Sequence, residues 1–178
     1  MINLIAGHGG DDVGAVGVNK RTESSETIRL RNLIKGYMPP GASVKVDEDR
    51  DSLSTVLKKI VTGSGSITLD IHFNASTNAT ATGVEVLVGD DAGREDLMLA
   101  SDVLDVVIKH TGLRNRGIKK EGDTPRKRLG VMRELGAVCL LEVCFISNPS
   151  DMAAYDKAIN AIAKGLADVL VKHDTLRS

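Results

Sequence analysis

Apolar residues recur along this chain with two different spacings. Short apolar runs, or apolar residues alternating with a period of two, indicate β-strands, whereas spacings of three and four residues indicate amphipathic helices. By these criteria the predicted strands are 2–6, 43–46, 67–74, 84–88 and 137–145. The predicted helices are 23–38, 53–61, 96–110, 129–135 and 152–170. Strands and helices therefore alternate through most of the chain.

Turn-forming residues separate these elements. The glycine-rich stretch up to Gly17 and the polar stretch 113–128 show no apolar period, so we expect both to be loops. Pro39 and Pro40 end the first predicted helix, because a proline inside a helix removes a hydrogen bond and clashes with the preceding turn.

The alternation of strands with helices predicts the fold class. It favours an α/β domain with a mostly parallel, twisted sheet flanked by helices on both faces. The 178 residues suit one domain over 1–178, with a core over about 1–173, and neither an internal repeat nor a low-complexity linker divides them. Because ligands bind at the carboxyl ends of the strands in such sheets, polar residues near those ends are the first candidates for a site.

The net charge and the lengths of the apolar runs argue against two kinds of partner, nucleic acid and the membrane interior. A net charge of −1 and a pI near 6.4 give no electrostatic case for nucleic-acid binding. The basic residues around 125–128 fit a solvated loop. No apolar run approaches the roughly 18 residues that a membrane span needs.

The start of the chain and its two cysteines suggest a cytoplasmic origin without disulfides. The first residues lack the charged region of a signal peptide and lead at once into the first predicted strand, so we expect synthesis in a cytoplasm. Cys139 and Cys144 lie in one predicted strand, about 16 Å apart, which is too far for a disulfide. We expect two buried thiols.

Four polar residues stand out against the apolar pattern. His8 and His72 follow or end predicted strands, Glu23 begins a helix, and Glu142 interrupts the apolar run CLLEVCFI. Catalytic zinc commonly takes three His or carboxylate ligands and leaves one position open. A buried carboxylate tends toward a raised pKa, which suits acid–base catalysis. We therefore expect His8, Glu23 and His72 as ligands of one Zn²⁺ and Glu142 as the general base.

Each of these residues also has an ordinary structural interpretation. A single histidine in a strand is more often a hydrogen-bonded core residue than a ligand, and a glutamate in the first turn of a helix is favoured by the helix dipole. His110 and His173 occur late in predicted helices, where a cation is favourable, and we do not expect them to bind metal. Cys144 is a poor nucleophile candidate, because nothing nearby lowers its pKa.

Taken in order, these segments resemble the motifs of the zinc-dependent N-acetylmuramoyl-L-alanine amidases of the amidase-3 family, found in bacterial autolysins and phage endolysins. GHGGDDVGAVG is similar to the first family motif, DIHFNAS to the second and LLEVCFISNPSD to the third. NRGIK (115–119) and GVMREL (130–135) follow the family order. The resemblance covers essentially the whole chain and implies a phosphorylase/hydrolase-like α/β fold.

The resemblance also implies roles for individual residues. It makes His8 and His72 zinc ligands and Glu142 the catalytic glutamate. The third ligand is Glu23 or Glu26; Glu23 is preferred, because apolar residues follow it at the family spacing. Asn74 and Arg116, each beside a motif, are candidates for substrate contact, with a purely structural role as the alternative.

The chain departs from the family motifs at two positions. Asp70 replaces the serine that precedes the second histidine motif, and a carboxylate there is suited to orienting a zinc ligand. Cys144 replaces a glycine near the catalytic glutamate. Neither change removes a reacting group, so we expect activity to survive.

The implied reaction is hydrolysis of the amide between N-acetylmuramic acid and L-alanine in peptidoglycan. The same residue types would also serve a peptidoglycan carboxypeptidase or deacetylase, and a non-catalytic wall-binding module is a third alternative. The absence of a signal peptide favours a phage or prophage endolysin that reaches the cell wall through a holin. We expect a monomer without a separate wall-binding domain. Residues 172–178 are either a natural tail or a cut linker.

Overall fold

The computed structural model describes residues 1–78 and 80–176. Its strands are β1 (Ile2–Ala6), β2 (Val44–Val46), β3 (Ile67–Asn74), β4 (Val84–Val88), β5 (Asn115–Lys120) and β6 (Ala137–Phe145). The helices are α1 (Glu23–Tyr37), α2 (Leu53–Lys59), α3 (Arg94–Thr111) and α4 (Pro149–Thr175). Three short 3-10 turns join them: η1 (Val18–Lys20), η2 (Glu121–Asp123) and η3 (Gly130–Arg133).

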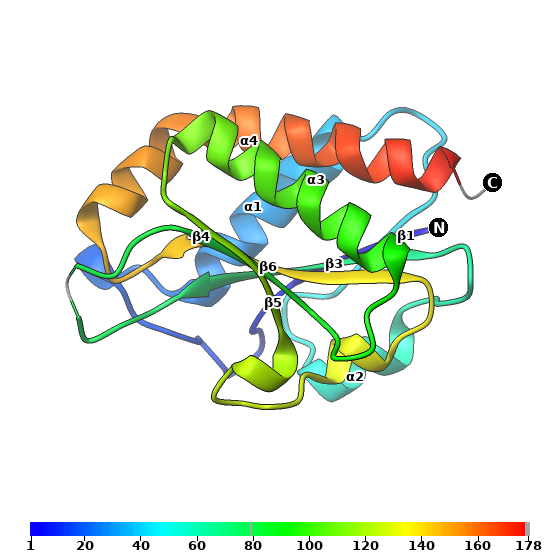
Figure 1. The fold of residues 1–178 in the computed structure, drawn as a ribbon, viewed down its shortest axis with the longest axis horizontal. Helices are drawn as coiled ribbons and strands as arrows, with labels where there is room; N and C mark the ends of the chain where they lie inside the picture. Colours follow the sequence, from blue (N-terminus) through cyan, green and yellow to red (C-terminus); the bar gives the residue numbers. More distant parts are fainter. Residues whose placement is uncertain (79, 177–178) are drawn as a thin grey trace.

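All six strands form one sheet, in the order β2-β1-β3-β6-β4-β5. Four neighbouring strands, β2, β1, β3 and β6, run parallel. The other two strands reverse direction, because β4 is antiparallel to β6 and β5 is parallel to β4. The sheet is therefore mostly parallel, as the alternation of strands and helices predicts, with a two-stranded edge of opposite direction (Figure 1).

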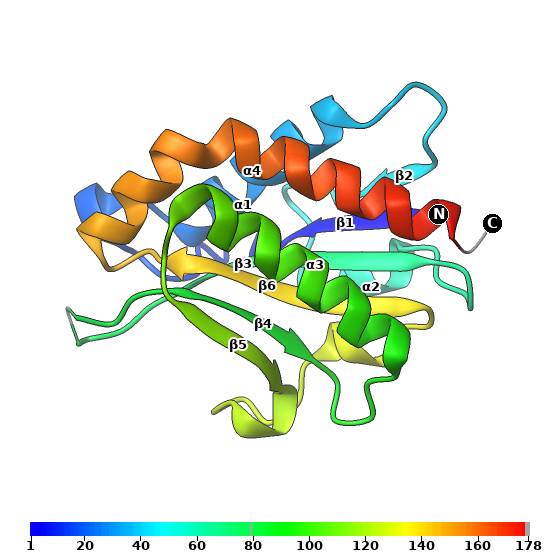
Figure 2. The same ribbon diagram turned by 45° about the horizontal axis from the view of Figure 1, so that its top comes forward.

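Helices cover both faces of the sheet, but unequally (Figures 1 and 2). The long helices α1, α3 and α4 pack on one face, where the larger hydrophobic core includes Leu30, Leu104 and Leu166. On the other face α2 and η3 cover a smaller core that includes Val56 and Val131. Since α2 has only 7 residues, it covers much less of its face than the three long helices cover of theirs.

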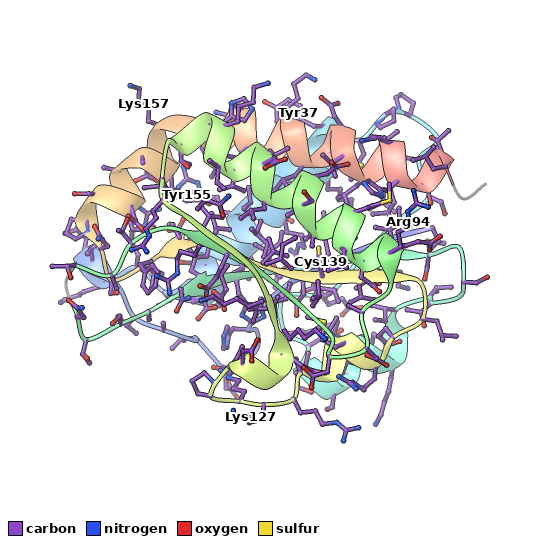
Figure 3. The ribbon with its side chains drawn as sticks, viewed as in Figure 1. Tyr37, Arg94, Lys127, Cys139, Tyr155 and Lys157 are labelled. Atoms are coloured by element: carbon purple, nitrogen blue, oxygen red, sulfur yellow. The ribbon has the colours of Figure 1, made fainter. Side chains whose placement is uncertain are left out.

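The side chains follow this division between interior and surface. Cys139 and Tyr155 lie between the sheet and the long helices, whereas Lys127 and Lys157 point away from the molecule (Figure 3). Both cysteines are free and buried, as expected. Burial raises the pKa of the Cys144 thiol well above its usual range, which removes it as a nucleophile.

The predicted elements need three corrections. The stretch 113–128 is not simply a loop, because it contains β5 and η2. The predicted helix 129–135 is reduced to the 3-10 turn η3, and Gly130 is one of its four residues. The last helix continues to Thr175, so most of the predicted tail is helical; residues 177 and 178 lie outside the described part of the chain.

A buried carboxylate joins the carboxyl end of β6 to the segment that enters β4. Asp151, in the first turn of α4, is 0% exposed. Its Oδ2 accepts hydrogen bonds from the backbone N–H groups of Phe145 and Gly83, each at 3.0 Å, and its Oδ1 accepts one from the Thr82 hydroxyl. Because Phe145 ends β6, this carboxylate fixes the strand that carries Glu142.

Replacing Asp151 with alanine is expected to lower the free energy of unfolding by about 2–5 kcal/mol, because two buried N–H groups lose their acceptor. Urea unfolding monitored by circular dichroism measures the change. Asp168→Ala is the matched control on the same helix: its side chain is 66% exposed, and among the described residues it pairs with Lys164 alone. That control should change stability by at most about 0.5 kcal/mol. Equal effects of the two substitutions would contradict this role of Asp151.

Candidate metal centre and active site

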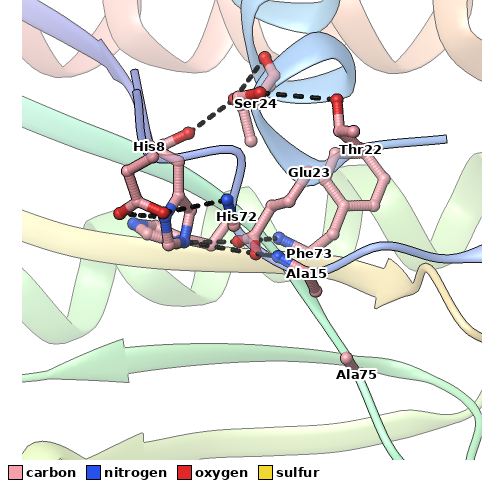
Figure 4. Close-up of polar contacts among 12 residues, drawn as sticks. His8, Ala15, Thr22, Glu23, Ser24, His72, Phe73 and Ala75 are labelled. Atoms are coloured by element: carbon pink, nitrogen blue, oxygen red, sulfur yellow. Dashed lines mark hydrogen bonds and ion pairs between the residues drawn. The ribbon is translucent and has the colours of Figure 1, made fainter. Parts of the chain in front are cut away.

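Three potential metal ligands converge on one face of the sheet from three different elements. His8 lies in the loop just after β1, Glu23 is the first residue of α1, and His72 is in β3. One donor atom from each of the three lies within 4.8 Å of the others. Figure 4 shows their side chains pointing toward one another. The fold thus brings together the three residues that the sequence motifs indicate.

The Glu23 carboxylate lies between the two imidazoles. Its Oε1 is 3.0 Å from His72 Nδ1, and its Oε2 is 3.2 Å from His8 Nε2. Backbone N–H groups of Phe73 and Ala15 donate to the same two oxygens, at 3.1 and 3.0 Å. The carboxylate is therefore held by the strand of one histidine and by the loop of the other, and its orientation does not depend on the imidazoles alone.

Local backbone conformation explains how α1 presents this carboxylate. Thr22 is the N-cap of α1, and its hydroxyl oxygen accepts a hydrogen bond from the backbone N–H of Ser25 at 3.3 Å. The Glu23 N–H donates to the Ala15 carbonyl at 2.8 Å. The helix therefore begins against the glycine-rich loop, with its first side chain facing the histidines.

Two glycines are required by the close packing of the candidate ligands. A Cβ on Gly7 would lie 2.4 Å from the His72 ring, and a Cβ on Gly14 would lie 2.8 Å from both Glu23 and His8. His8 itself has a φ of 65°, a left-handed conformation that is uncommon for a residue with a side chain. The GHGG motif therefore leaves room for the His72 ring and turns His8 toward Glu23.

Glu23 and each of the two histidines stabilise each other's charged form. Burial would raise the pKa of Glu23, but hydrogen bonds to His72 and His8 outweigh it and hold the pKa far below its usual range. The hydrogen bond to Glu23 raises the pKa of His8 despite partial burial. Burial opposes the charged form of His72, but Asp70 and Glu23 raise its pKa well above the usual value. The site is thus built to hold positive charge.

The second nitrogen of each imidazole faces a further carboxylate. His8 Nδ1 is 2.8 Å from Asp12 Oδ2, and His72 Nε2 is 3.4 Å from Asp70 Oδ2. Carboxylates in this position orient histidine ligands and increase their basicity. Asp70, 2% exposed, thus occupies the place that its substitution for the family serine suggests. Asp12 is placed to orient His8 in the same way, although its position in the first motif did not predict this role.

Glu142 lies beside His72 on the same face. The parallel pairing of β3 with β6 aligns the two residues directly. Glu142 Oε2 is one of three buried side-chain atoms in the described residues for which no hydrogen-bond partner is found. Burial raises the pKa of Glu142 to about 7, although His72 lowers it. A carboxylate with one unpaired oxygen and that pKa is suited to accepting and returning a proton near neutral pH.

The site lies on the face of the sheet more than at its edge. His72 lies two residues before the end of β3 and Glu142 three residues before the end of β6, because these strands run to Asn74 and Phe145 as predicted. The short α2 does not cover these positions as a long helix would (Figure 2).

A second polar cluster lies next to Glu142, on the neighbouring strands of the sheet. Glu85 on β4 is aligned with Glu142 and is 7% exposed. Asn74 Nδ2 donates to Glu85 Oε1 at 2.8 Å, while Arg116 Nε and Lys119 Nζ donate to Oε2 at 2.6 and 2.5 Å. The Asn74 amide is thus held by Glu85, whereas Arg116 lies in the charged cluster around the same carboxylate.

Sequence reasoning missed Glu85 and Lys119. Glu85 carries the signal that identified Glu142, a glutamate inside an otherwise apolar strand, VEVLV. Lys119 has no comparable signal, because its place depends on the pairing of β5 with β4. The structure is needed to connect these residues to the site.

The remaining candidates lie elsewhere. Glu26 forms ion pairs with Arg21 at 2.7 Å and Arg29 at 3.5 Å, so it is engaged on another side of α1. His173 is buried beside Asp102, with its Nε2 2.8 Å from Oδ2, and His110 is in the last turn of α3. Of Glu23 and Glu26, only Glu23 faces the two histidines of the site.

A protein-family model matches residues 2–172 and describes N-acetylmuramoyl-L-alanine amidases. The chain belongs to this amidase family. It is therefore an enzyme of the class that breaks down the peptidoglycan of cell walls. The match includes every residue of the candidate site, from His8 to Glu142.

Individual relatives agree with the family assignment. Two solved amidase structures share the fold: an N-acetylmuramoyl-L-alanine amidase from Clostridium difficile 630 (TM-score 0.80, 22% identity, 99% of this chain and 97% of that one) and the catalytic domain of CwlV from Bacillus (Paenibacillus) polymyxa var. colistinus (0.76, 25%, 96% and 96%). The uncharacterized protein YqiI of Bacillus subtilis (strain 168) is 28% identical, over 93% of this chain and 82% of its own length. Within 1–78 and 80–176, no helix combines the length and apolar character needed to cross a membrane.

Proposed function

We propose that this amidase is zinc-dependent and cleaves the amide between the lactyl group of N-acetylmuramic acid and the L-alanine of the stem peptide. The observation that carries the proposal is the arrangement of two histidines and one carboxylate within 4.8 Å, beside Glu142, whose buried Oε2 has no hydrogen-bond partner among the described residues. The first three suit a divalent metal, and the fourth suits proton transfer.

The donor set fits zinc. Two imidazoles and one carboxylate are a common protein ligand set of catalytic zinc and leave a position for water or substrate. Asp12 and Asp70 support the two imidazoles from behind. When bound to His8, Glu23 and His72, zinc would polarise the scissile carbonyl and lower the pKa of water.

The residues of this chain would carry the proton transfers. Glu142 in its ionised form accepts a proton from the attacking water as that water adds to the carbonyl carbon. The resulting carboxylic acid then donates the proton to the alanine nitrogen as the C–N bond breaks. The products are the free lactyl carboxylate and a stem peptide with a free amino terminus, and Glu142 is ionised again. A pKa of about 7 allows both steps near neutral pH.

The biological setting is part of the proposal. We propose a monomeric enzyme, made in the cytoplasm, that acts on the cell wall as a phage or prophage endolysin after holin-mediated release. Induced expression in a host, with and without a holin, tests this setting: lysis only with the holin would support it. Lysis that does not depend on the holin would count against it.

Product analysis tests the proposed activity. The protein loaded with zinc is incubated with N-acetylmuramoyl-tripeptide, and the products are identified by mass spectrometry. Free tripeptide and N-acetylmuramic acid are the expected products. A shortened peptide would indicate a carboxypeptidase, loss of acetate a deacetylase, and unchanged substrate a binding module. A chelator should abolish the reaction and added zinc should restore it.

A further inference from the structure

On β5, two positively charged side chains pair with a single carboxylate. Arg116 and Lys119 share one oxygen of Glu85, which is 7% exposed. The side chains of Arg116 and Lys119 are 27% and 35% exposed. Burial would raise the pKa of Glu85, but Lys119 and Arg116 lower it, so the carboxylate is ionised. The three residues therefore carry one excess positive charge that reaches solvent.

The cluster leaves hydrogen-bond donors available. Arg116 uses its Nε for Glu85 and lies over the Phe145 ring, 5.0 Å from its centroid, which fixes the plane of the guanidinium. Within the described part of the chain, Glu85 is the single salt-bridge partner of Lys119. An ammonium has three donors, so Lys119 retains capacity for a second anion.

The distance between this charge and Glu142 is similar to the distance, in the substrate, between the cleaved bond and a free carboxylate. Glu142 is aligned with Glu85 on the next strand, and the strand after that is β5. Two strand spacings are about 10 Å, but both cations reach back to Glu85 on the intervening strand, so their charge lies between about 5 and 10 Å from Glu142 across the sheet. In the stem peptide, L-alanine is followed by a D-glutamate joined through its side chain, so the α-carboxylate of this second residue is free. That carboxylate lies two residues from the cleaved bond, about 7 Å along an extended chain.

We propose that Lys119 and Arg116 bind the α-carboxylate of the second stem-peptide residue and so favour D-isoglutamate over its amide, D-isoglutamine. This inference rests on the proposed amidase function. In this arrangement Glu85 positions the two cations, and Asn74 holds the other oxygen of Glu85. The sheet thus presents, in order, the candidate metal ligands, the general base and a carboxylate subsite.

Two substrates that differ at one group test the inference. N-acetylmuramoyl-L-alanyl-D-isoglutamate and the corresponding D-isoglutamine compound are prepared with the γ-carboxyl capped as a methylamide in both. The wild-type enzyme should show a kcat/KM about tenfold higher for the acid, since a partly exposed charged hydrogen bond contributes about one power of ten. Lys119→Met should lower the ratio several-fold, mainly through KM, because Arg116 alone then faces the carboxylate.

Further variants separate binding from a structural effect. Lys119→Arg keeps the charge and should keep the preference. Lys120→Met is the matched control, because Lys120 is the next residue of β5 but donates to the backbone carbonyl of Asp90. That control should behave as wild type.

Several outcomes would overturn the inference. It fails if the wild type does not distinguish the two substrates, if Lys119→Met slows both equally, or if Lys120→Met removes the preference as well. In those three cases cleavage at the lactyl amide still supports the proposed function. If the zinc-loaded wild type cleaves neither substrate, the proposed function fails and the inference fails with it.

Discussion

Replacing Glu142 with glutamine is expected to lower kcat by a factor of about 10²–10⁴ while the protein stays folded, because general acid–base catalysis contributes that much. Glutamine has nearly the same size but cannot accept the proton of water. Since Glu142 Oε2 has no hydrogen-bond partner within the described residues, the amide loses no protein contact there. Release of the stem peptide from a defined muropeptide measures the turnover, and metal analysis measures the bound zinc.

A matched control separates this effect from a general change of charge. Glu134 precedes β6 at the opposite end of the strand from the site and accepts a hydrogen bond from Thr62. Glu134→Gln should keep turnover within about twofold of the wild type, as a surface substitution remote from the chemistry. If Glu142→Gln retained full zinc and turned over as fast as this control, Glu142 would not be the general base.

Two strands show where hydrophobic pattern is sufficient to predict the fold. The strands 84–88 and 137–145 were predicted at their observed bounds, because both lie in the middle of the sheet and nearly every residue in them is buried. β5 was missed. It is an edge strand, NRGIKK, with Ile118 as its one apolar side chain, and none of its residues is fully buried. Its structure comes from pairing with β4, which no local pattern reveals.

The site was partly predictable for a similar reason. His8, His72 and Glu142 are recognisable because each contrasts with its neighbours in an ordered set of motifs. The relation of Glu142 to Glu85 depends on an antiparallel pairing between strands far apart in the chain. The excess charge of β5 reaches Glu85 through a further pairing, of β5 with β4, so it becomes visible only when the sheet order is known.

The choice between Glu23 and Glu26 shows what spacing can and cannot decide. The two residues are three apart on one helix, and both lie in its first turn. Apolar spacing favours Glu23, but it does not show which carboxylate faces the histidines. The structure adds the partners: two imidazoles for Glu23, and Arg21 with Arg29 for Glu26. Because the partners differ, substitution by glutamine should affect zinc binding at Glu23 and stability at Glu26.

Glu23→Gln is expected to lower zinc affinity at least about hundredfold and to abolish most of the activity. Groups that only orient zinc ligands affect affinity by about 10- to 100-fold, so loss of a ligand charge should reach or exceed that range. Titration with zinc against a competing chelator measures the affinity. His8→Ala should likewise lower both bound zinc and activity, and full zinc occupancy in either variant would contradict the ligand assignment.

Glu26→Gln is the matched control, with the same chemical change in the same turn of α1. It should leave zinc affinity within about twofold of the wild type, because Glu26 contacts arginines rather than the histidines. Its effect should appear in stability instead: loss of a charged hydrogen-bond partner costs about 1–3 kcal/mol. Urea unfolding of the zinc-free proteins measures that cost. If zinc affinity fell in Glu26→Gln and not in Glu23→Gln, the third ligand would be Glu26, and α1 would have to turn to present it.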